Sequence, residues 1–82
     1  MPLSQRGLTI RQVAIAILIA EGLTNAEIAE RLVISEGTVA NHIANALKIL
    51  GVRNRAQLAV WAVASGQYWP EWFGERPEGW AC

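Results

Sequence analysis

The side chains best suited to chemistry in this sequence are amides, hydroxyls and one amine, grouped in residues 23–50. Within this stretch Asn41, Asn45 and Lys48 follow one another at helical spacing, so they share one side of a helix. An asparagine amide can bond an adenine edge with two hydrogen bonds, and a lysine can reach guanine or a phosphate. These residue types therefore indicate hydrogen bonding to the edges of DNA bases.

Other polar side chains lie at predicted helix starts, where backbone N–H groups and hydroxyls can hold phosphates. The residues at or beside such positions are Thr24, Asn25, Ser35, Thr38, Arg53 and Arg55. We expect this set to contact the DNA backbone. For the two arginines, a side chain that is merely solvated is an equally simple interpretation.

Four helices are predicted from N-terminal caps and glycine stops. Thr9 and Thr24 each precede a Gln or Glu by three residues, the spacing of a capping box, and Ser35 and Asn54 cap the other two helices. The predicted helices cover about residues 10–21, 25–32, 36–50 and 55–65. The second and third are joined by a tight turn, as in a helix-turn-helix. We therefore expect an all-α fold, a compact four-helix domain that contains a helix-turn-helix.

The helix predicted over residues 36–50 has two different sides at about 100° per residue. The apolar side carries Val39, Ile43, Ala46 and Leu50 and should face the core. The opposite side is small and polar, which suits close approach to a duplex. The expected base-facing residues are Ala40, Asn41, Ala44, Asn45 and Lys48. Because any solvated helix face can look the same, the pattern alone leaves both interpretations open.

The formal net charge of the 82 residues is zero, although DNA-binding modules usually carry a basic excess. Residues 1–70 hold six basic and four acidic residues, whereas residues 71–82 hold one basic and three acidic residues. The zero total therefore combines a mildly basic domain with an acidic tail.

Composition divides the chain into a leader over residues 1–7, the helical domain over residues 8–67 and a Trp-rich tail over residues 68–82. The tail shows neither helical nor strand periodicity, so we expect it to be irregular. The short leader is compatible both with a stand-alone protein and with an excised C-terminal domain.

The residue types argue against catalysis, a metal site and a membrane anchor. No acid completes a triad with Ser35 and His42, and His42 is the single histidine, so no catalytic residue, metal or cofactor is predicted. The apolar run over residues 13–20 is far shorter than the ~20 residues of a membrane helix, and a signal peptide is the weaker alternative. The single cysteine, Cys82, excludes a disulfide within one chain. We expect a cytoplasmic protein that is not an enzyme.

Four motifs resemble the LuxR-type (GerE-like) DNA-binding domain of bacterial transcription regulators. They are LTIR at residues 8–11, AEGLTNAEIAERL at 20–32, ISEGTVANHI at 34–43 and LGVRNR at 50–55. The resemblance covers about residues 8–67 and implies regulation of transcription by binding double-stranded DNA. It implies that the third helix enters the major groove and that the second helix contacts the DNA backbone. It also implies that the fourth helix pairs two copies of the domain. It also places His42 beside the DNA backbone, where a packed border residue is the alternative.

The fourth predicted helix has a second, partly apolar set of residues besides its core positions, and helices with two such faces often pair. The residues expected in a homodimer interface are Ala56, Val60, Val63 and Gln67. A scatter of small apolar surface residues is the alternative.

Two positions depart from the family pattern, which usually has a basic residue at the positions of Ala40 and Ile49. Each lost phosphate contact weakens binding at every DNA sequence. We therefore expect an isolated domain of low affinity that needs dimerisation or a partner. The alternative function is a degenerate helix-turn-helix that docks another regulatory protein or domain through the first helix and the aromatic tail.

The first predicted helix is apolar nearly all round, which indicates burial on more than one side. Ile10, Val13 and Ile17 therefore need a cover. We expect the Trp-rich tail to cover these residues. A second protomer or another protein is the alternative cover, and a tail left in solvent would leave them uncovered. An ion pair between Arg11 and Glu27 is also expected to brace the first two helices.

Overall fold

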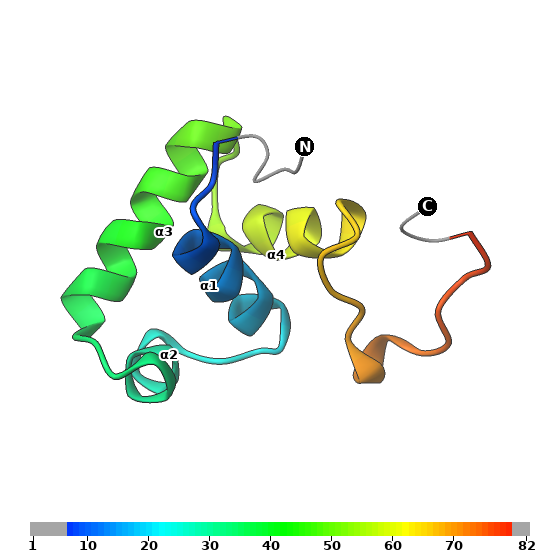
Figure 1. Ribbon diagram of the computed structural model, residues 1–82, viewed down its shortest axis with the longest axis horizontal. Helices are drawn as coiled ribbons and strands as arrows, with labels where there is room; N and C mark the ends of the chain where they lie inside the picture. The colour runs from blue at the N-terminus through cyan, green and yellow to red at the C-terminus, as the bar shows by residue number, and fades with distance from the viewer. Residues whose placement is uncertain (1–6, 80–82) are drawn as a thin grey trace.

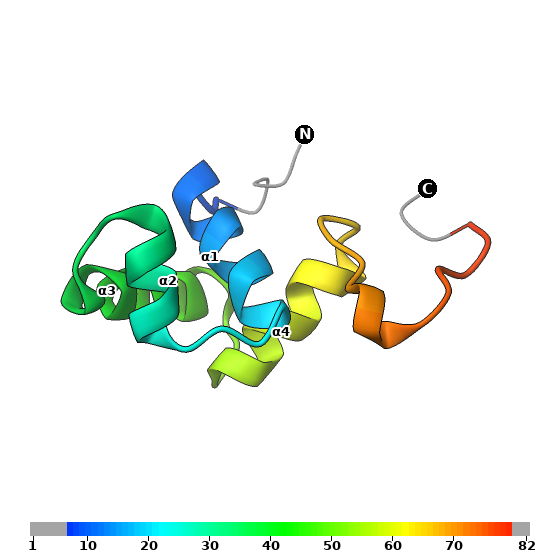
Figure 2. The same cartoon turned by 90° about the horizontal axis from the view of Figure 1, so that it is seen from below.

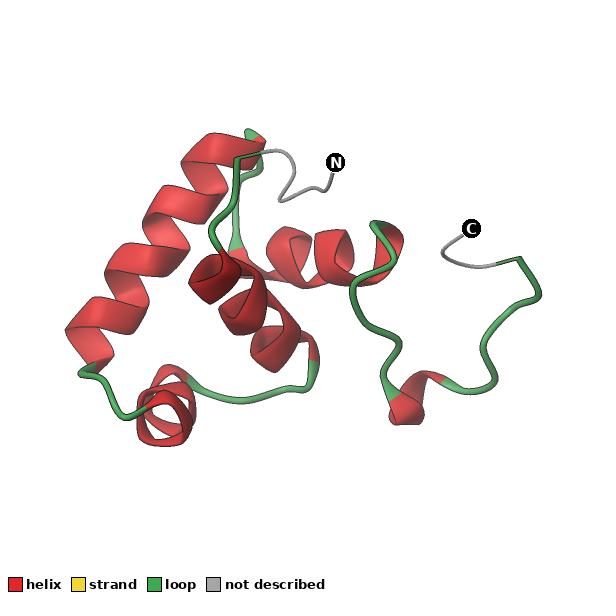
Figure 3. Cartoon of the chain, in the orientation of Figure 1, coloured by secondary structure: helices red, strands yellow, loops and turns green. Residues whose placement is uncertain are grey.

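A computed structural model describes residues 7–79 of the chain. It contains four α-helices and one turn of 3-10 helix, and no strand among the described residues (Figures 1 and 3). The elements are α1 (Ile10–Ala20), α2 (Asn25–Leu32), α3 (Glu36–Leu50), α4 (Arg55–Ala64) and the 3-10 helix η2 (Glu71–Phe73). The predicted all-α, four-helix fold is therefore confirmed. Residues 1–6 of the predicted leader and 80–82 of the predicted tail lie outside the described residues.

The helices begin where the capping residues predicted. The hydroxyl of Thr9 accepts from the Gln12 N–H at 3.1 Å, and the Gln12 side chain accepts from the Thr9 N–H at 2.9 Å. Thr24 and Glu27 form the same reciprocal pair at the start of α2. The helices α3 and α4 begin with single side-chain caps. Because each cap satisfies N–H groups that have no partner inside the helix, each stabilises its helix by about 0.5–2 kcal/mol.

The turn of the helix-turn-helix depends on an unusual residue. Val33 ends α2 in the left-handed conformation, with φ 58° and ψ 50°, and its side chain is 87% exposed. A β-branched residue rarely adopts this conformation, because its side chain crowds the backbone. The reversal lets the Ile34 N–H donate to the Ala29 carbonyl at 3.0 Å and brings Ile34 against the core. The predicted turn is therefore present, at the cost of local strain.

The core forms around α1, which packs against each of the other three helices (Figure 1). Ile15, Ile28, Val39 and Leu58, one from each helix, are fully buried. Burying such a side chain stabilises the fold by about 1.5–3 kcal/mol. This packing holds α2 and α3 in a fixed relation, so that the outer side of α3 is a surface on a rigid support.

The described part of the tail is irregular apart from one turn of 3-10 helix, as predicted. Trp69 donates its indole N–H to the Gly74 carbonyl at 2.7 Å, and the Phe73 ring lies 5.0 Å from Trp69 and 5.4 Å from Trp72 between centroids. Pro70 is buried. The aromatic residues thus close a short turn around η2 within this irregular segment.

The expectation that the tail covers Ile10 is wrong. Ile10 is 88% exposed, while Val13 and Ile17 are half-buried against the core. The tail follows the C-terminal end of α4 (Figure 2). Its Tyr68 hydroxyl donates at 2.8 Å to a carboxylate oxygen of Glu21, just beyond the C-terminal end of α1. Burial, this hydrogen bond and the nearby negative charge raise the pKa of Tyr68 above its usual value. An eleven-residue helix is roughly 16 Å long, so the tail docks far from Ile10.

Candidate nucleic-acid interface

The outer side of α3 is a continuous exposed surface. Every predicted base-facing residue on it is exposed, and the intervening core positions Val39, Ile43 and Ala46 are buried. Figure 1 shows α3 along one edge of the molecule, with no other helix on its outer side. The exposed residues of this surface, which we name the α3 face, are Gly37, Ala40, Asn41, Ala44, Asn45 and Lys48. The predicted division of the helix into a core side and a free side is therefore correct.

The α3 face is shallow and weakly charged. Its protruding side chains are the amides of Asn41 and Asn45, and Lys48 is its single cation. The alanines between them present only methyl groups. Because small side chains keep the helix backbone close to whatever surface it meets, this geometry suits insertion into a groove about 12 Å wide.

The N-terminal end of α3 adds backbone donors to this surface. Ser35 accepts from the Thr38 N–H at 3.0 Å, and the two hydroxyls are 2.9 Å apart. The N–H groups of Glu36 and Gly37 precede the first hydrogen bond within the helix, so they point out of its end. Such a helix end attracts anions such as phosphate. His42 lies half-buried at the border between the two sides of α3, as the helical spacing predicted.

Two residues expected at the DNA backbone contact each other. The Arg55 guanidinium donates to the Asn25 side-chain oxygen at 2.6 Å and to the Leu23 carbonyl at 3.1 Å. Both Arg55 and Asn25 are half-buried. The bonds join the start of α4 to the start of α2, thirty residues earlier in the sequence. Arg55 therefore positions the N-terminal end of α2, a role that sequence reasoning missed because no local pattern links the two residues.

The structure leaves two other residues that are predicted to contact the DNA backbone accessible at the surface. Thr24 and Arg53 are exposed, and the Thr24 hydroxyl caps α2. The expected ion pair between Arg11 and Glu27 does not form between these two described residues. The Glu27 carboxylate instead accepts from the Thr24 backbone N–H at 2.8 Å, since the capping box holds that side chain at the helix end.

The residues expected in a dimer interface lie on the outer side of α4 or just beyond its end. Ala56, Val60 and Gln67 are exposed, and Val63 is half-buried. Val60 and Val63 line an apolar groove beside the tail, and Ala56 and Gln67 are not among the residues that line it. The four residues therefore do not all belong to one hollow.

Two further observations concern the range from Gly7 to Gly79. No three His, Cys, Asp or Glu side chains there come together in a way that could hold a metal ion. No helix there combines the length and the hydropathy that crossing a bilayer requires.

The four helices and the tight turn between α2 and α3 define a helix-turn-helix domain. The family model described as bacterial regulatory proteins, luxR family (GerE) matches residues 6–62, and the chain belongs to this family. Family membership implies DNA-binding regulation of transcription, as the four sequence motifs predicted. A search of curated proteins finds no match for the chain. The family match ends within α4, so it does not include the tail.

Proposed function

We propose that this chain binds double-stranded DNA in a sequence-dependent manner, with α3 in the major groove and two copies paired through α4. The observation that carries the proposal is the α3 face, which is exposed, small and polar along the whole helix. The protein acts by stoichiometric recognition rather than by chemistry, in the cytoplasm of a bacterium. The DNA-binding domain is residues 8–67, with residues 1–7 as a leader and 68–82 as a tail.

The residue types on the α3 face favour A·T base pairs. Asn41 and Asn45 can each bond an adenine through two hydrogen bonds, and the methyl groups of Ala40 and Ala44 suit contact with thymine methyls. Lys48 reaches guanine or a phosphate at the end of the site. Because Lys48 is the single cation of the face, it offers at most one of the arginine or lysine contacts that most often select guanine.

Backbone contacts set the register of α3 in the groove. Thr24, Ser35 and Thr38 lie at the starts of α2 and α3, where helix ends favour phosphates. His42 and Arg53 extend this set along the strand. We assign Asn25 to the same surface, with Arg55 as the side chain that holds it in place.

Binding to a labelled duplex tests the proposal. A pool of random duplexes should be bound at low salt, and selection should enrich A·T-rich half-sites. Replacing thymine by uracil in the selected site removes only the thymine methyl group. Binding should then weaken, because the methyl groups of Ala40 and Ala44 lose this contact. A duplex whose mobility is unchanged by the protein at low salt would refute DNA binding, whereas binding without a base preference would refute the assignment of the α3 face.

A second candidate function is a protein-interaction module that keeps the fold. The exposed Ile10 on α1 and the exposed aromatic side chains of the tail favour it, since large apolar side chains in water often mark a contact surface. Here the partner is another regulatory protein or domain. The duplex experiment separates the two functions, because a protein-interaction module should not bind DNA even at low salt.

A further inference from the structure

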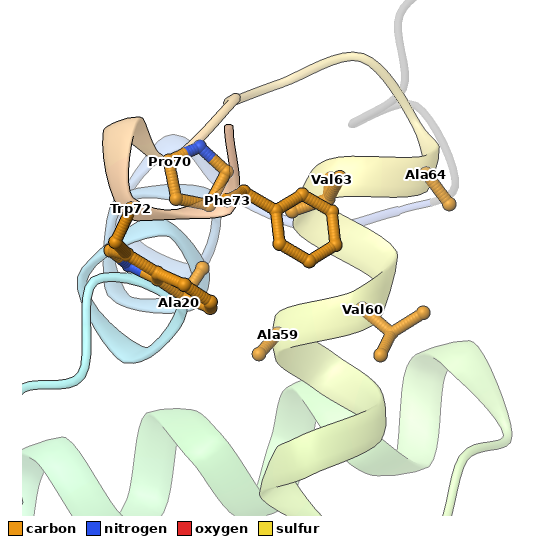
Figure 4. A pocket seen from close by; sticks show the side chains of 8 residues that line it. All are labelled: Ala20, Ala59, Val60, Val63, Ala64, Pro70, Trp72 and Phe73. Atoms are coloured by element: carbon orange, nitrogen blue, oxygen red, sulfur yellow. The ribbon is translucent and has the colours of Figure 1, made fainter. Parts of the chain in front are cut away.

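A shallow apolar groove lies between α4 and the tail (Figure 4). One wall is formed by Val60, Val63 and Ala64 of α4, and the other by Trp72 and Phe73 of η2. Its volume is about 200 Å³. The groove exists only because the aromatic turn of the tail is held beside α4.

The side chains around the groove are left in water. Val60 is 64% exposed, Trp72 is 68% exposed and Phe73 is 54% exposed. Each apolar side chain that stays in water forgoes the stabilisation that burial would give. Three such side chains around one hollow indicate a surface that is covered in the working protein.

The chemistry of the groove excludes several kinds of occupant. At about 200 Å³ it is smaller than the roughly 300–1,000 Å³ of ligand pockets, and no polar side chain lines it to orient a small molecule. Nucleic acid and anionic membranes both require cations, and residues 56–70 contain no charged residue. The remaining class of occupant is an apolar protein surface.

The charge pattern identifies which protein surface fits. A two-fold interface brings the same surface of both copies together, so an uncharged surface meets no like charge. The charges at the two ends of this uncharged surface are of opposite sign. Arg53 lies before α4 and Arg55 is its first residue, whereas Glu71 lies beyond its C-terminal end. In an antiparallel pair of α4 helices, the basic end of one copy faces the acidic end of the other.

We propose that the groove is part of a homodimer interface in which the tail supplies Trp72 and Phe73 and each copy inserts its exposed Val60 into the groove of the other. The inference rests on the proposed pairing through α4 and adds the tail to it. Figures 1 and 2 show α3 and the tail at opposite ends of the molecule, so filling the groove leaves the α3 face free for DNA. Dimerisation, and with it DNA affinity, therefore depends on the tail.

Sedimentation equilibrium of the 82-residue chain tests the inference. The Val60→Glu variant places a charge on the exposed side of α4, and Trp72→Ala removes one wall of the groove. Val33→Asp is the matched control, because it exchanges another exposed apolar residue for an acid at a position outside the groove. Circular dichroism confirms that each variant keeps the helical fold, since none of the three positions belongs to the buried core.

The wild-type chain should form a dimer whose dissociation constant rises at least about tenfold in both groove variants and stays unchanged in Val33→Asp. A wild-type chain that is monomeric at every soluble concentration overturns the inference. Weakening by Val60→Glu but not by Trp72→Ala also overturns it, while leaving the pairing through α4 intact. Binding of the wild-type chain to random duplexes is measured in parallel, so that loss of the DNA-binding function is recognised separately.

Discussion

At the scale of single residues, the candidate interface combines side chains that we propose contact DNA with side chains that hold the others in place. Lys48 is the only cation on the α3 face. The half-buried Arg55, by contrast, donates two hydrogen bonds to acceptors within the protein. A guanidinium that bonds an amide oxygen and a backbone carbonyl stabilises the junction of two helices. The two cations should therefore respond differently to removal.

Lys48→Ala should weaken binding at any DNA sequence, because one phosphate or base contact is lost. If Lys48 contacts a phosphate, the slope of log affinity against log salt should fall by about one unit. Fluorescence anisotropy at several salt concentrations measures the slope. Arg76→Ala, which removes the same charge from the tail, is the control and should leave the slope unchanged. An unchanged affinity in Lys48→Ala removes this residue from the interface.

Arg55→Ala should lower the free energy of unfolding by about 1–3 kcal/mol, because the Leu23 carbonyl and the Asn25 amide lose their partner. Urea unfolding monitored by circular dichroism measures the change. Arg53→Ala, two residues away and exposed, should change the free energy of unfolding by less than about 0.5 kcal/mol. Equal losses in the two variants would contradict a bracing role for Arg55.

At the scale of elements, the angle between α2 and α3 depends on one strained residue. Val33 in the left-handed region costs about 1–3 kcal/mol, which the core contacts of the following Ile34 offset. The turn is therefore held by packing rather than by its own preference. A residue that tolerates this conformation should make the same turn at lower cost.

Val33→Asn should raise the free energy of unfolding by about 1 kcal/mol, because asparagine adopts the left-handed conformation more readily than valine. Thermal or urea unfolding measures it. Ile10→Asn is the control, since it also removes an exposed apolar side chain but lies in a helix with an ordinary backbone. If Ile10→Asn stabilises the chain as much, the gain comes from surface polarity and the strain at Val33 is not its cause.

At the scale of the whole molecule, local patterns predicted the helices well and contacts between distant segments poorly. Capping residues mark helix starts because their hydrogen bonds span only three residues, as Thr9 with Gln12 shows. The free side of α3 also follows from spacing along one helix. By contrast, the bond between Arg55 and Asn25 and the exposure of Ile10 depend on how distant segments pack. The irregular path of the tail was predicted, but the turn around η2 was not, because it depends on a few aromatic contacts without any periodicity.

The proposed two-fold pairing makes a prediction about the spacing of the DNA site. Half-sites read by a symmetric dimer lie about one helical turn, roughly 34 Å, apart on the same side of the duplex. Inserting about 5 bp, half a turn, between them rotates one half-site to the far side and should abolish joint binding. Inserting a full turn of about 10 bp should restore part of it. Equal affinity for all three spacings would argue for binding by single copies.

The most direct test of the account is an NMR titration of the labelled chain with a selected duplex. The side-chain amide signals of Asn41 and Asn45 report on the α3 face, and the indole signal of Trp72 reports on the tail. If α3 enters the major groove, both asparagine amides should shift strongly, and Trp72 should change little at a concentration where the protein is already dimeric. Shifts confined to Trp72 and to α1, with unchanged asparagine signals, would contradict the insertion of α3 into the major groove.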